Sequence, residues 1–535
     1  MGKRMNNGPG SLAVGLSDPG MTALHKVGLA GLYMTLSALE KDAAAIKRRP
    51  AGANWRLSDR SIALQCGPDP KAFFDWLIKE SFTIDKNGLA GFAASRNAGC
   101  SGQEAALRNE LLLGIHFQVP TTSGRGGMQS RNFGTDDAPL VLRYPAFTWL
   151  AHQRAAPNEQ NEVKGWLMPG ASQRHSGHAG TCLAEPLSRF LCLLFLPVGA
   201  VYFRVKQKHV RPKDKRKPQT GVPRCALVAP EFNRLDAYAR LRGSFYRSGV
   251  AELTVSGTAE AAWRVAALAH LEDLVREDLG VFRCRAYAFG NSPGTRQVTR
   301  IGLVVVQNPD SAELLVYSMA RQFFPGQWRK AQDGTSYWVA PQIPELVAEN
   351  LTVHQPWWAG FADFMADRVR RDWILGIVRD GRGRLIKMVK GEKGGLAEMV
   401  TQQMTATAET TFVQACHAAW RRRMAQIGDK ARREGSSFRD QVQREYIRLY
   451  MLFTRCKNAA TLREAVIAFW ARGGSSLAPL QSNWPGVFAL MDERGNWRKA
   501  KDLALLALAS YKATGEDEAE ALETEGTITE EETQG

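Results

Sequence analysis

Several chemistries are missing from this sequence. It contains no G-x-x-x-x-G-K-[ST] loop for nucleotide phosphates and no H-E-x-x-H zinc pair. It also lacks the His-Asp dipeptide of metal phosphohydrolases. Because each motif carries the chemistry of a large enzyme class, their absence argues against catalysis. We therefore expect a protein that is not an enzyme and that needs no cofactor.

Cysteines and long apolar runs are also scarce. The eight cysteines form no C-x-x-C pair, so we expect no disulfide framework and a reducing, cytoplasmic location. The longest apolar run, residues 190–203, is interrupted by Pro197 and Gly199 and is too short to span a bilayer. No apolar signal segment is visible near residue 1 either. These features predict neither secretion nor membrane insertion.

One serine pattern matches a known nucleophile motif. Residues 290–294 read Gly-Asn-Ser-Pro-Gly, which fits G-x-S-x-G. A nucleophile elbow needs a helix after the serine and a backbone N–H on the next residue. Pro293 has no N–H, and a strand-like run follows. The pattern therefore favours a turn.

Two groups of candidate metal ligands are equally weak. Asp136 and Asp137 are too few carboxylates for a hard cation, which takes six or more oxygens. A His/Cys group fits no standard zinc spacing, and we interpret it as a polar loop; its members are His152, His175, His178 and Cys182. We expect no metal site.

Positive charge is what the sequence has in excess. Lys and Arg number 70 against 53 acidic residues, a formal net charge of +17. Residues 516–535 contain acidic side chains and no Lys or Arg, so the remainder is more basic still. An excess of this size attracts polyanions, of which nucleic acid is the first expectation.

The strongest local signal is the segment 204–217, which holds eight Lys or Arg and one Asp. Pro212 and Pro218 oppose a helix, and strand-like sequence lies on both sides. We predict a basic finger that contacts phosphates, with a merely solvated loop as the alternative. Its predicted DNA-binding residues are Arg204, Lys206, Lys208, Arg211, Lys213, Lys215, Arg216 and Lys217.

A second candidate is the Gly-rich segment 120–137, which the composition predicts to be a long loop. Its glycines permit close backbone approach, and its polar side chains suit base edges and phosphates. An exposed loop without function is the alternative. The predicted contacts are Arg125, Gln129, Arg131 and Asn132.

Two further basic clusters support a track for a nucleic-acid backbone. Residues 368–393 carry nine Lys or Arg against three acids. Arg421, Arg422 and Arg423 add charge to a predicted helix. A basic helix face is usually just solvated, but basic clusters in separate elements favour binding.

The periodicity predicts an α+β protein. Residues 1–390 read as a mixed α/β body carrying the DNA-contacting loops, with a strand predicted over 190–208. Glycines at 391–395 suggest a break, and 391–515 read as a helical bundle. Residues 516–535 read as a disordered acidic tail. Two apolar stripes define the first bundle helices: Phe412, Cys416, Trp420 and Met424, then Phe438, Val442, Tyr446, Leu449 and Phe453.

Three segments, His25–Leu32, Phe73–Ile84 and Leu227–Tyr238, together with this organisation, give the chain a family resemblance. It resembles the large subunit of type I CRISPR Cascade complexes, the Cas-eight family, in its myxobacterial-type branch. The resemblance implies an antiviral ribonucleoprotein subunit that recognises a protospacer-adjacent motif (PAM) in duplex DNA and aids R-loop formation. The C-terminal bundle would then correspond to the small subunit of such complexes.

The partners implied are crRNA, target DNA, the other Cascade subunits, and an effector that is either a helicase-nuclease or a transposition adaptor. Two alternatives stay open from the residues themselves: a metal-dependent nuclease, and an assembly protein that binds only RNA. The motif read, the effector, a free small subunit from an internal start and the role of the acidic tail are left open by the sequence.

Overall fold

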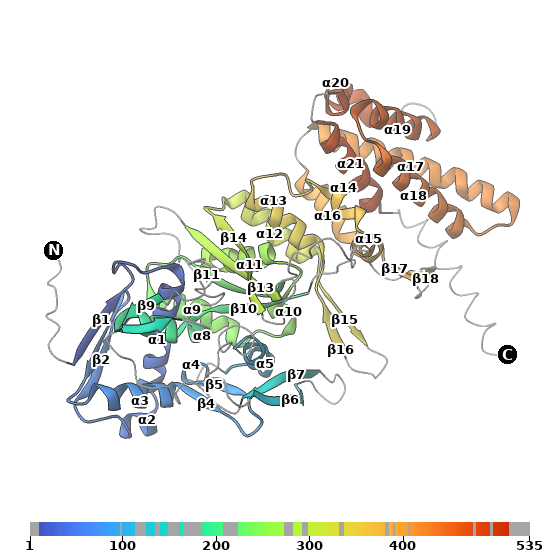
Figure 1. The fold of residues 1–535 in the computed structure, drawn as a ribbon. Helices are drawn as coiled ribbons and strands as arrows, with labels where there is room; N and C mark the ends of the chain where they lie inside the picture. Colours follow the sequence, from blue (N-terminus) through green and yellow to red (C-terminus); the bar gives the residue numbers. More distant parts are fainter. Residues whose placement is uncertain are drawn as a thin grey trace, which may run out of the picture. The chain divides into compact units, whose positions relative to one another are not determined.

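The computed structural model describes most of the chain between residues 10 and 512, and its contacts divide the chain into two compact units (Figure 1). The first unit comprises residues 1–207, 212–314 and 326–341, and the second comprises 208–211, 315–325 and 342–535. The described ranges are 10–96, 99–112, 125–133, 140–147, 160–163, 183–206, 223–271, 282–291, 298–330, 336–379, 385–388, 391–404, 407–473, 478–492 and 496–512.

The first unit is built around a five-stranded sheet in the order β12-β10-β11-β13-β14. Neighbouring strands are antiparallel except for the parallel pair β10–β12. Helix α11 (Thr258–Leu271) packs on β11, β13 and β14. The strands are β10 (Val201–Val205), β11 (Pro223–Pro230), β12 (Thr254–Val255), β13 (Arg283–Asn291) and β14 (Val298–Gln307).

A helical core lies next to this sheet. Helix α1 (Ala23–Glu40) is buried along most of its length, and it packs on α7 (Leu187–Leu194), α8 (Leu196–Gly199) and α9 (Leu235–Tyr246). Its polar start is capped by Thr22, whose hydroxyl accepts from the His25 backbone N–H. Smaller elements complete the unit: β1 (Ser11–Gly15), α2 (Ala43–Lys47), β2 (Ala53–Leu57), β3 (Ser61–Cys66), α3 (Pro70–Ser81), β4 (Phe82–Ile84), β5 (Ala90–Phe92), α4 (Ala93–Arg96), α5 (Gly102–Leu111) and α10 (Val250–Leu253). Three two-stranded pairs belong to it as well: β6 (Arg125–Asn132) with β7 (Val141–Phe147), β8 (Gln160–Val163) with β9 (Leu183–Pro186), and β15 (Gln327–Lys330) with β16 (Ser336–Val339).

The prediction of one strand over 190–208 is wrong. Residues 187–199 form the helices α7 and α8, and only Val201–Val205 is a strand. A short, fully apolar run does not distinguish a buried strand from a buried helix. Here α7 and α8 pack against α1, and this packing stabilises helices in the segment.

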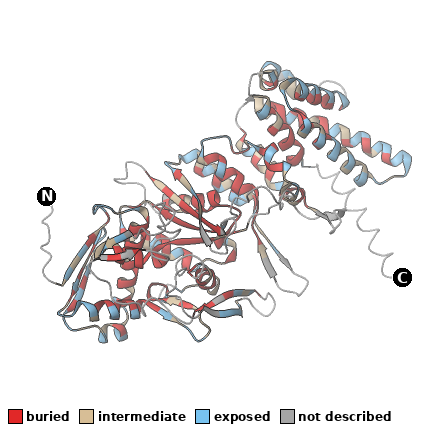
Figure 2. Ribbon diagram, viewed as in Figure 1, coloured by how far each residue is buried: buried red, intermediate tan, exposed pale blue. Residues whose placement is uncertain are grey.

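The second unit is helical from residue 408 to 510 wherever it is described, which confirms the predicted α+β class. Helix α17 buries the first predicted stripe on one face, whereas α21 is buried on nearly all sides (Figure 2). The elements are α12 (Ser311–Phe323, mainly in this unit), α13 (Ile343–Thr352), α14 (Phe361–Ala366), α15 (Arg368–Ile374), β17 (Ile377–Arg379), β18 (Leu385–Met388), α16 (Lys393–Gln403), α17 (Thr407–Glu434), α18 (Phe438–Arg455), α19 (Ala459–Arg472), α20 (Ala478–Asp492) and α21 (Trp497–Ser510).

Within residues 391–395, predicted to be a break, Gly391, Glu392 and Gly395 are closely packed inside the second unit, whereas Gly394 is exposed. A Cβ on Gly391 would lie 2.2 Å from the carbonyl oxygen of Ile374, so only glycine fits there. The Glu392 carboxylate accepts from the backbone N–H of Gln342 and from Nε1 of Trp373, at 2.8 and 2.6 Å. The domain boundary at residue 391 stays a prediction, and the acidic tail 516–535 lies outside the described residues.

Candidate nucleic-acid interface

The basic segment 204–217 begins at the end of a central strand. Its first residues lie in and just after β10, which is antiparallel to β11, and residues 207–222 connect the two strands. Arg204 is half-buried and donates from Nη2 to Oε2 of Glu110 at 2.6 Å. Lys206 donates from Nζ to the carbonyl oxygen of Trp338 at 3.3 Å. The other predicted contacts fall outside the described residues: Lys208, Arg211, Lys213, Lys215, Arg216 and Lys217.

The Gly-rich segment differs from its prediction. Residues 125–132 form strand β6 (Arg125–Asn132), which pairs antiparallel with β7 (Val141–Phe147). The prediction of one irregular loop over 120–137 is therefore wrong for this part. The composition concealed the strand because Gly, Ser and Asn are depleted in strands in general. Pairing with an apolar partner strand overrides that preference here.

The predicted contacts on β6 are not equivalent. Gln129 is exposed. Arg131 lies 3.4 Å from Oδ2 of Asp85, and Asn132 accepts from the backbone N–H of Leu140 at 3.0 Å through Oδ1. Arg125 starts the strand, and its side chain lies outside the described residues. Among the described side chains of this set, Gln129 is thus the most available to a ligand.

Helix α5 links these two predicted clusters, and the sequence analysis did not identify it. Gln103 donates to the carbonyl oxygen of Phe133 at 3.4 Å, next to the hairpin, while Glu110 holds Arg204 of β10. A Cβ on Gly102 would lie 2.1 Å from the Phe133 ring, so the helix and the hairpin fit closely. The available signal was Ser101 followed three residues later by Glu104, an S-x-x-E pattern that marks a helix start.

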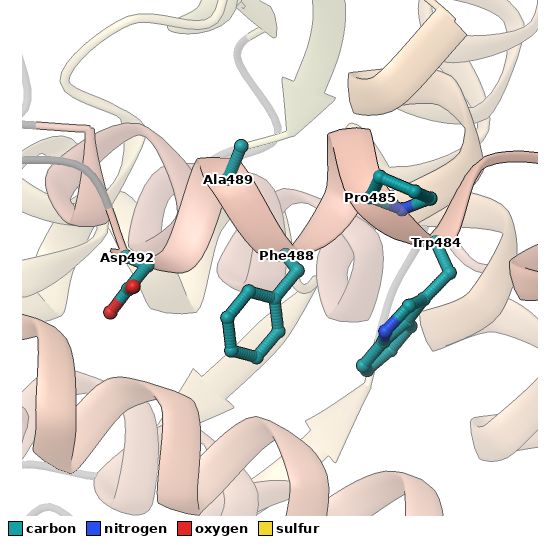
Figure 3. Close-up of a pocket in the computed structure, with 5 residues that line it drawn as sticks. All are labelled: Trp484, Pro485, Phe488, Ala489 and Asp492. Carbon is teal, nitrogen blue, oxygen red and sulfur yellow. The ribbon is translucent and has the colours of Figure 1, made fainter.

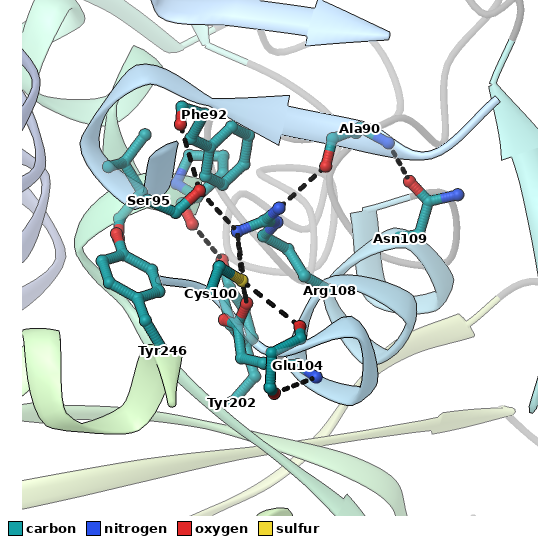
Figure 4. A network of polar contacts seen from close by, with 12 residues as sticks. Ala90, Phe92, Ser95, Cys100, Glu104, Arg108, Asn109, Tyr202 and Tyr246 are labelled. Carbon is teal, nitrogen blue, oxygen red and sulfur yellow. Dashed lines mark hydrogen bonds and ion pairs between the residues drawn. The ribbon is translucent and has the colours of Figure 1, made fainter. Parts of the chain in front are cut away.

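A buried charge network anchors α5 (Figure 4). Glu104 pairs with Arg108 at 3.2 Å and with Arg242 at 2.9 Å, and each of the three residues is 3% exposed or less. Desolvation alone raises the pKa of Glu104, but the two guanidinium groups outweigh it and hold the pKa below its usual range. Burial raises the pKa of the neighbouring Cys100 thiol to about 12, and this thiol donates to Oε2 of Glu104 at 2.9 Å. The network positions α5 and does not face a ligand.

The arginines predicted on a helix lie in the second unit, on α17. Arg421 and Arg422 are exposed. Arg422 lies on the side opposite the buried stripe that contains Trp420 and Met424, whereas Arg421 flanks this stripe. Arg423 is less exposed and donates from Nε to Oε1 of Glu445 on α18 at 2.9 Å. Helix α17 is therefore amphipathic: its apolar face is buried, and arginine side chains outside that face are exposed to solvent.

The second unit also has an open, mainly apolar pocket on α20 (Figure 3). Its one charged lining residue, Asp492, lies 2.7 Å from Nη2 of Arg463. An apolar surface with a paired carboxylate does not suit a phosphate. The lining residues are Trp484, Pro485, Phe488, Ala489 and Asp492.

Three weaker sequence predictions concern a serine pattern, candidate metal ligands and membrane spans. Strand β13 ends at Asn291 and strand β14 begins at Val298. The serine of the G-x-S-x-G pattern lies between them, outside the described residues, so the turn stays a prediction. Within the described ranges, no three His, Cys, Asp or Glu side chains are placed to hold a metal. The candidate ligands lie outside those ranges: Asp136, Asp137, His152, His175, His178 and Cys182. Among the described residues, no helix is long and apolar enough to cross a membrane.

The three segments that carry the family resemblance meet in the core. In α1, a Cβ on Gly31 would lie 2.2 Å from the carbonyl oxygen of Phe195, so α1 and α8 touch at backbone distance. The Phe82 ring stacks on Phe195 at 5.5 Å, and the Tyr238 hydroxyl donates to the carbonyl oxygen of Gly199 at 2.6 Å. These segments therefore maintain the fold and do not form a site.

Comparison with known proteins gives the following similarities. Residues 13–194 match the DevT N-terminal domain and residues 401–535 match the DevT C-terminal domain. The chain is also 27% identical over 539 residues to the CRISPR-associated protein Cas8a1/Csx13 of Myxococcus xanthus (strain DK1622). That alignment covers 96% of this chain and 90% of the relative.

Proposed function

We propose, on the premise that this chain is a homologue of Cas8a1/Csx13 along almost its whole length, that it is the non-catalytic large subunit of a type I CRISPR Cascade complex. The observation that carries this proposal is the extent of the similarity, which includes both units. The basic composition agrees with it, because a subunit that holds guide RNA and target DNA must neutralise phosphates. Guide pairing would read the sequence, and this subunit would read the motif in the duplex.

The proposal is tested by what the chain binds in its native cells. A tagged chain should co-purify with a crRNA that carries a repeat-derived handle and with the other Cascade subunits. RNase treatment before purification, as a control, should release the RNA. A chain that purifies alone, or with RNA lacking repeat sequence, would contradict the proposal. Cleavage of DNA by the purified chain with Mg²⁺ or Mn²⁺ would support the nuclease alternative instead.

Motif recognition is assigned to the β6–β7 hairpin, with Gln129 as the base-reading residue. Its side chain is exposed, and an amide can bond two atoms of an adenine edge. Gln129→Ala should lower discrimination between motif variants by about 1–3 kcal/mol while leaving affinity for non-specific duplex unchanged. Ser130→Ala, whose side chain lies on the other face of the same strand, is the matched control. Asn132 is a poorer test because it also accepts the Leu140 N–H.

Phosphate contact is assigned to the basic segment 204–217. Changing five of its basic residues to glutamine should weaken binding to every duplex and lower the slope of its salt dependence by ~0.9 for each phosphate that the variant no longer neutralises. Lys71→Gln, on the exposed face of helix α3, is the control. A slope equal to that of the wild-type chain would exclude this segment. The substituted residues are Lys208, Lys213, Lys215, Arg216 and Lys217.

Two finer assignments complete the proposal. Arg421 and Arg422 would hold the displaced single strand by charge, since both extend from α17 into solvent. The bound complex would then recruit a helicase-nuclease or a transposition adaptor. An assembly protein that binds only RNA would bind its crRNA equally well whether or not the duplex motif is present, and would show no motif-dependent affinity for DNA.

A further inference from the structure

One side of helix α18 combines exposed aliphatic side chains with arginines. Ile447 and Met451 lie one turn apart and are 43% and 39% exposed, although side chains of this kind are usually buried. Arg444, Arg448 and Arg455 recur at the period of the helix on the same side, opposite its buried face. We call these five residues the α18 stripe. The stripe presents both positive charge and apolar area to solvent.

The positive charge of the α18 stripe is only partly balanced by neighbouring acids. Nη2 of Arg448 lies 2.5 Å from Oε1 of Glu445. Arg444 donates from Nε to the backbone carbonyl oxygen of Asp440 at 3.3 Å and not to its carboxylate. Among the described residues, no carboxylate lies at ion-pair distance from Arg444 or Arg455. Exposed guanidinium groups of this kind attract a negatively charged ligand.

The aliphatic residues of the stripe favour an acidic peptide over nucleic acid as this ligand. Phosphates would pair with the arginines, but they would leave Ile447 and Met451 in water, and the stripe holds no aromatic ring on which a base could stack. A peptide with both acidic and apolar side chains would cover the two kinds of residue together. The chemistry of the stripe therefore matches an acidic, partly apolar segment.

The chain itself contains such a segment, the acidic tail 516–535. It has nine acidic residues and no Lys or Arg, and its bulky apolar residues are Leu522 and Ile528. A carboxylate-rich segment with these two side chains is complementary to the α18 stripe in both charge and polarity. The composition of the tail therefore makes it a suitable occupant of the stripe.

The tail also starts close to the stripe, within the same unit. Lys512, four positions before the first tail residue, lies 3.7 Å from Glu398 of α16. Lys393, the first residue of α16, lies 5.4 Å from the ring centroid of Tyr446, which directly precedes Ile447 in α18. An extended segment reaches up to ~3.3 Å per residue, so the tail is long enough to lie along the whole helix.

We propose that the acidic tail docks on the α18 stripe, with its carboxylates beside the arginines and its apolar side chains against Ile447 and Met451. Because the tail is tethered, it acts at an effective concentration on the order of millimolar, so weak contacts suffice to keep it docked. A docked tail competes with any other polyanion for these arginines. The inference does not depend on the proposed large-subunit role, since it concerns contacts within one chain.

The test compares Met451 in two full-length chains, the wild type and a neutral-tail variant in which each tail Glu is changed to Gln and Asp517 to Asn. Hydrogen peroxide oxidises exposed methionine to the sulfoxide, and mass spectrometry of the digested protein follows the rate. Met451 should oxidise about threefold or more slowly in the wild-type chain, because the docked tail covers its sulfur. Met128, which is 56% exposed in the first unit, is the control and should oxidise equally in both chains. Equal Met451 rates in the two chains would overturn the inference.

Two triple variants with the wild-type tail distinguish the stripe from the rest of the basic surface. Changing the three arginines of the stripe to glutamine should raise the Met451 rate to that of the neutral-tail chain, because the tail loses its counter-charges. Arg433→Gln, Arg472→Gln and Arg498→Gln remove the same charge from other exposed positions of the unit and should leave Met451 protected. Equal effects of the two triple variants would contradict docking on the stripe. In the neutral-tail chain, protection of Met451 by oligo-dT as strong as that given by the tail would assign the stripe to nucleic acid instead.

Discussion

In the first unit, the arginines around α5 are held by carboxylates from distant parts of the chain, as Arg204 is by Glu110 and Arg242 is by Glu104. In the second unit, Arg421 extends into solvent from α17. In the first unit, ion pairs join separate elements. In the second unit, the exposed arginine makes a helix surface positively charged.

This difference has energetic consequences. A buried guanidinium–carboxylate pair is costly to break, because the remaining charge stays out of water. An exposed arginine can be removed with little effect on folding, which leaves it available for a ligand. We therefore expect substitutions in the buried network around Glu104 to affect stability, and a substitution of the exposed Arg421 to affect binding.

The largest effect is expected at Glu104. Glu104→Gln keeps the shape of the side chain but leaves Arg108 and Arg242 without a buried counter-charge, which should cost about 3–5 kcal/mol of unfolding free energy. Asp492→Asn removes the more exposed partner of Arg463 in the second unit and should cost less than about 1 kcal/mol. Urea unfolding of both variants measures the difference. Similar costs would remove the contrast between the units.

A pH effect is expected from His417 in the second unit. Burial lowers its pKa to about 4, and its Nε2 contacts the Ala507 carbonyl oxygen at 3.0 Å. The unfolded chain, with the ordinary value of 6.5, binds a proton that the folded chain excludes. Stability should therefore fall as the pH drops from about 6.5 to about 4, by about 3 kcal/mol in total.

The measurement is the pH dependence of unfolding in the wild-type chain and in His417→Gln, which should lose this component. Asp502 titrates in the same range with the opposite sign, since burial raises its pKa to about 6, so the difference between the two chains is the relevant quantity. His354→Asn is the control, because His354 is exposed and asparagine tolerates its left-handed φ of 54°. Parallel profiles for the wild-type chain and His417→Gln would contradict the assignment.

The smallest effect is expected from a Gly→Ala substitution, made once in each unit. In α1, a Cβ on Gly28 would lie 1.8 Å from the Cys192 carbonyl oxygen, so Gly28→Ala should destabilise the chain by about 1–3 kcal/mol. In α17, a Cβ on Gly428 would make an ordinary 3.6 Å contact with the Phe438 ring. Gly428→Ala should therefore stabilise by up to ~1 kcal/mol through helix propensity. Thermal melts that shift in the same direction would refute this reasoning.

Some secondary-structure elements could be predicted from the sequence and others could not. Both stripes lie on helices as predicted, because the 3.6-residue period determines which side chains share a face. The prediction of a strand over 190–208 was wrong in its first part, since the uniformly apolar run 190–203 carries no period. The strand at 125–132 was not predicted because its Gly and polar residues are typical of loops and only its partner strand makes it a strand.

The sequence alone determined the α+β class, the amphipathic helices, the excess of positive charge and the family resemblance. Each of these depends on composition or on local periodicity, and both can be read from consecutive residues. Only the tertiary structure decided that α5 joins the two predicted clusters and that Arg204 and Arg423 are paired with Glu110 and Glu445. These properties depend on contacts between residues as much as 94 positions apart, and no local pattern encodes which partners will meet.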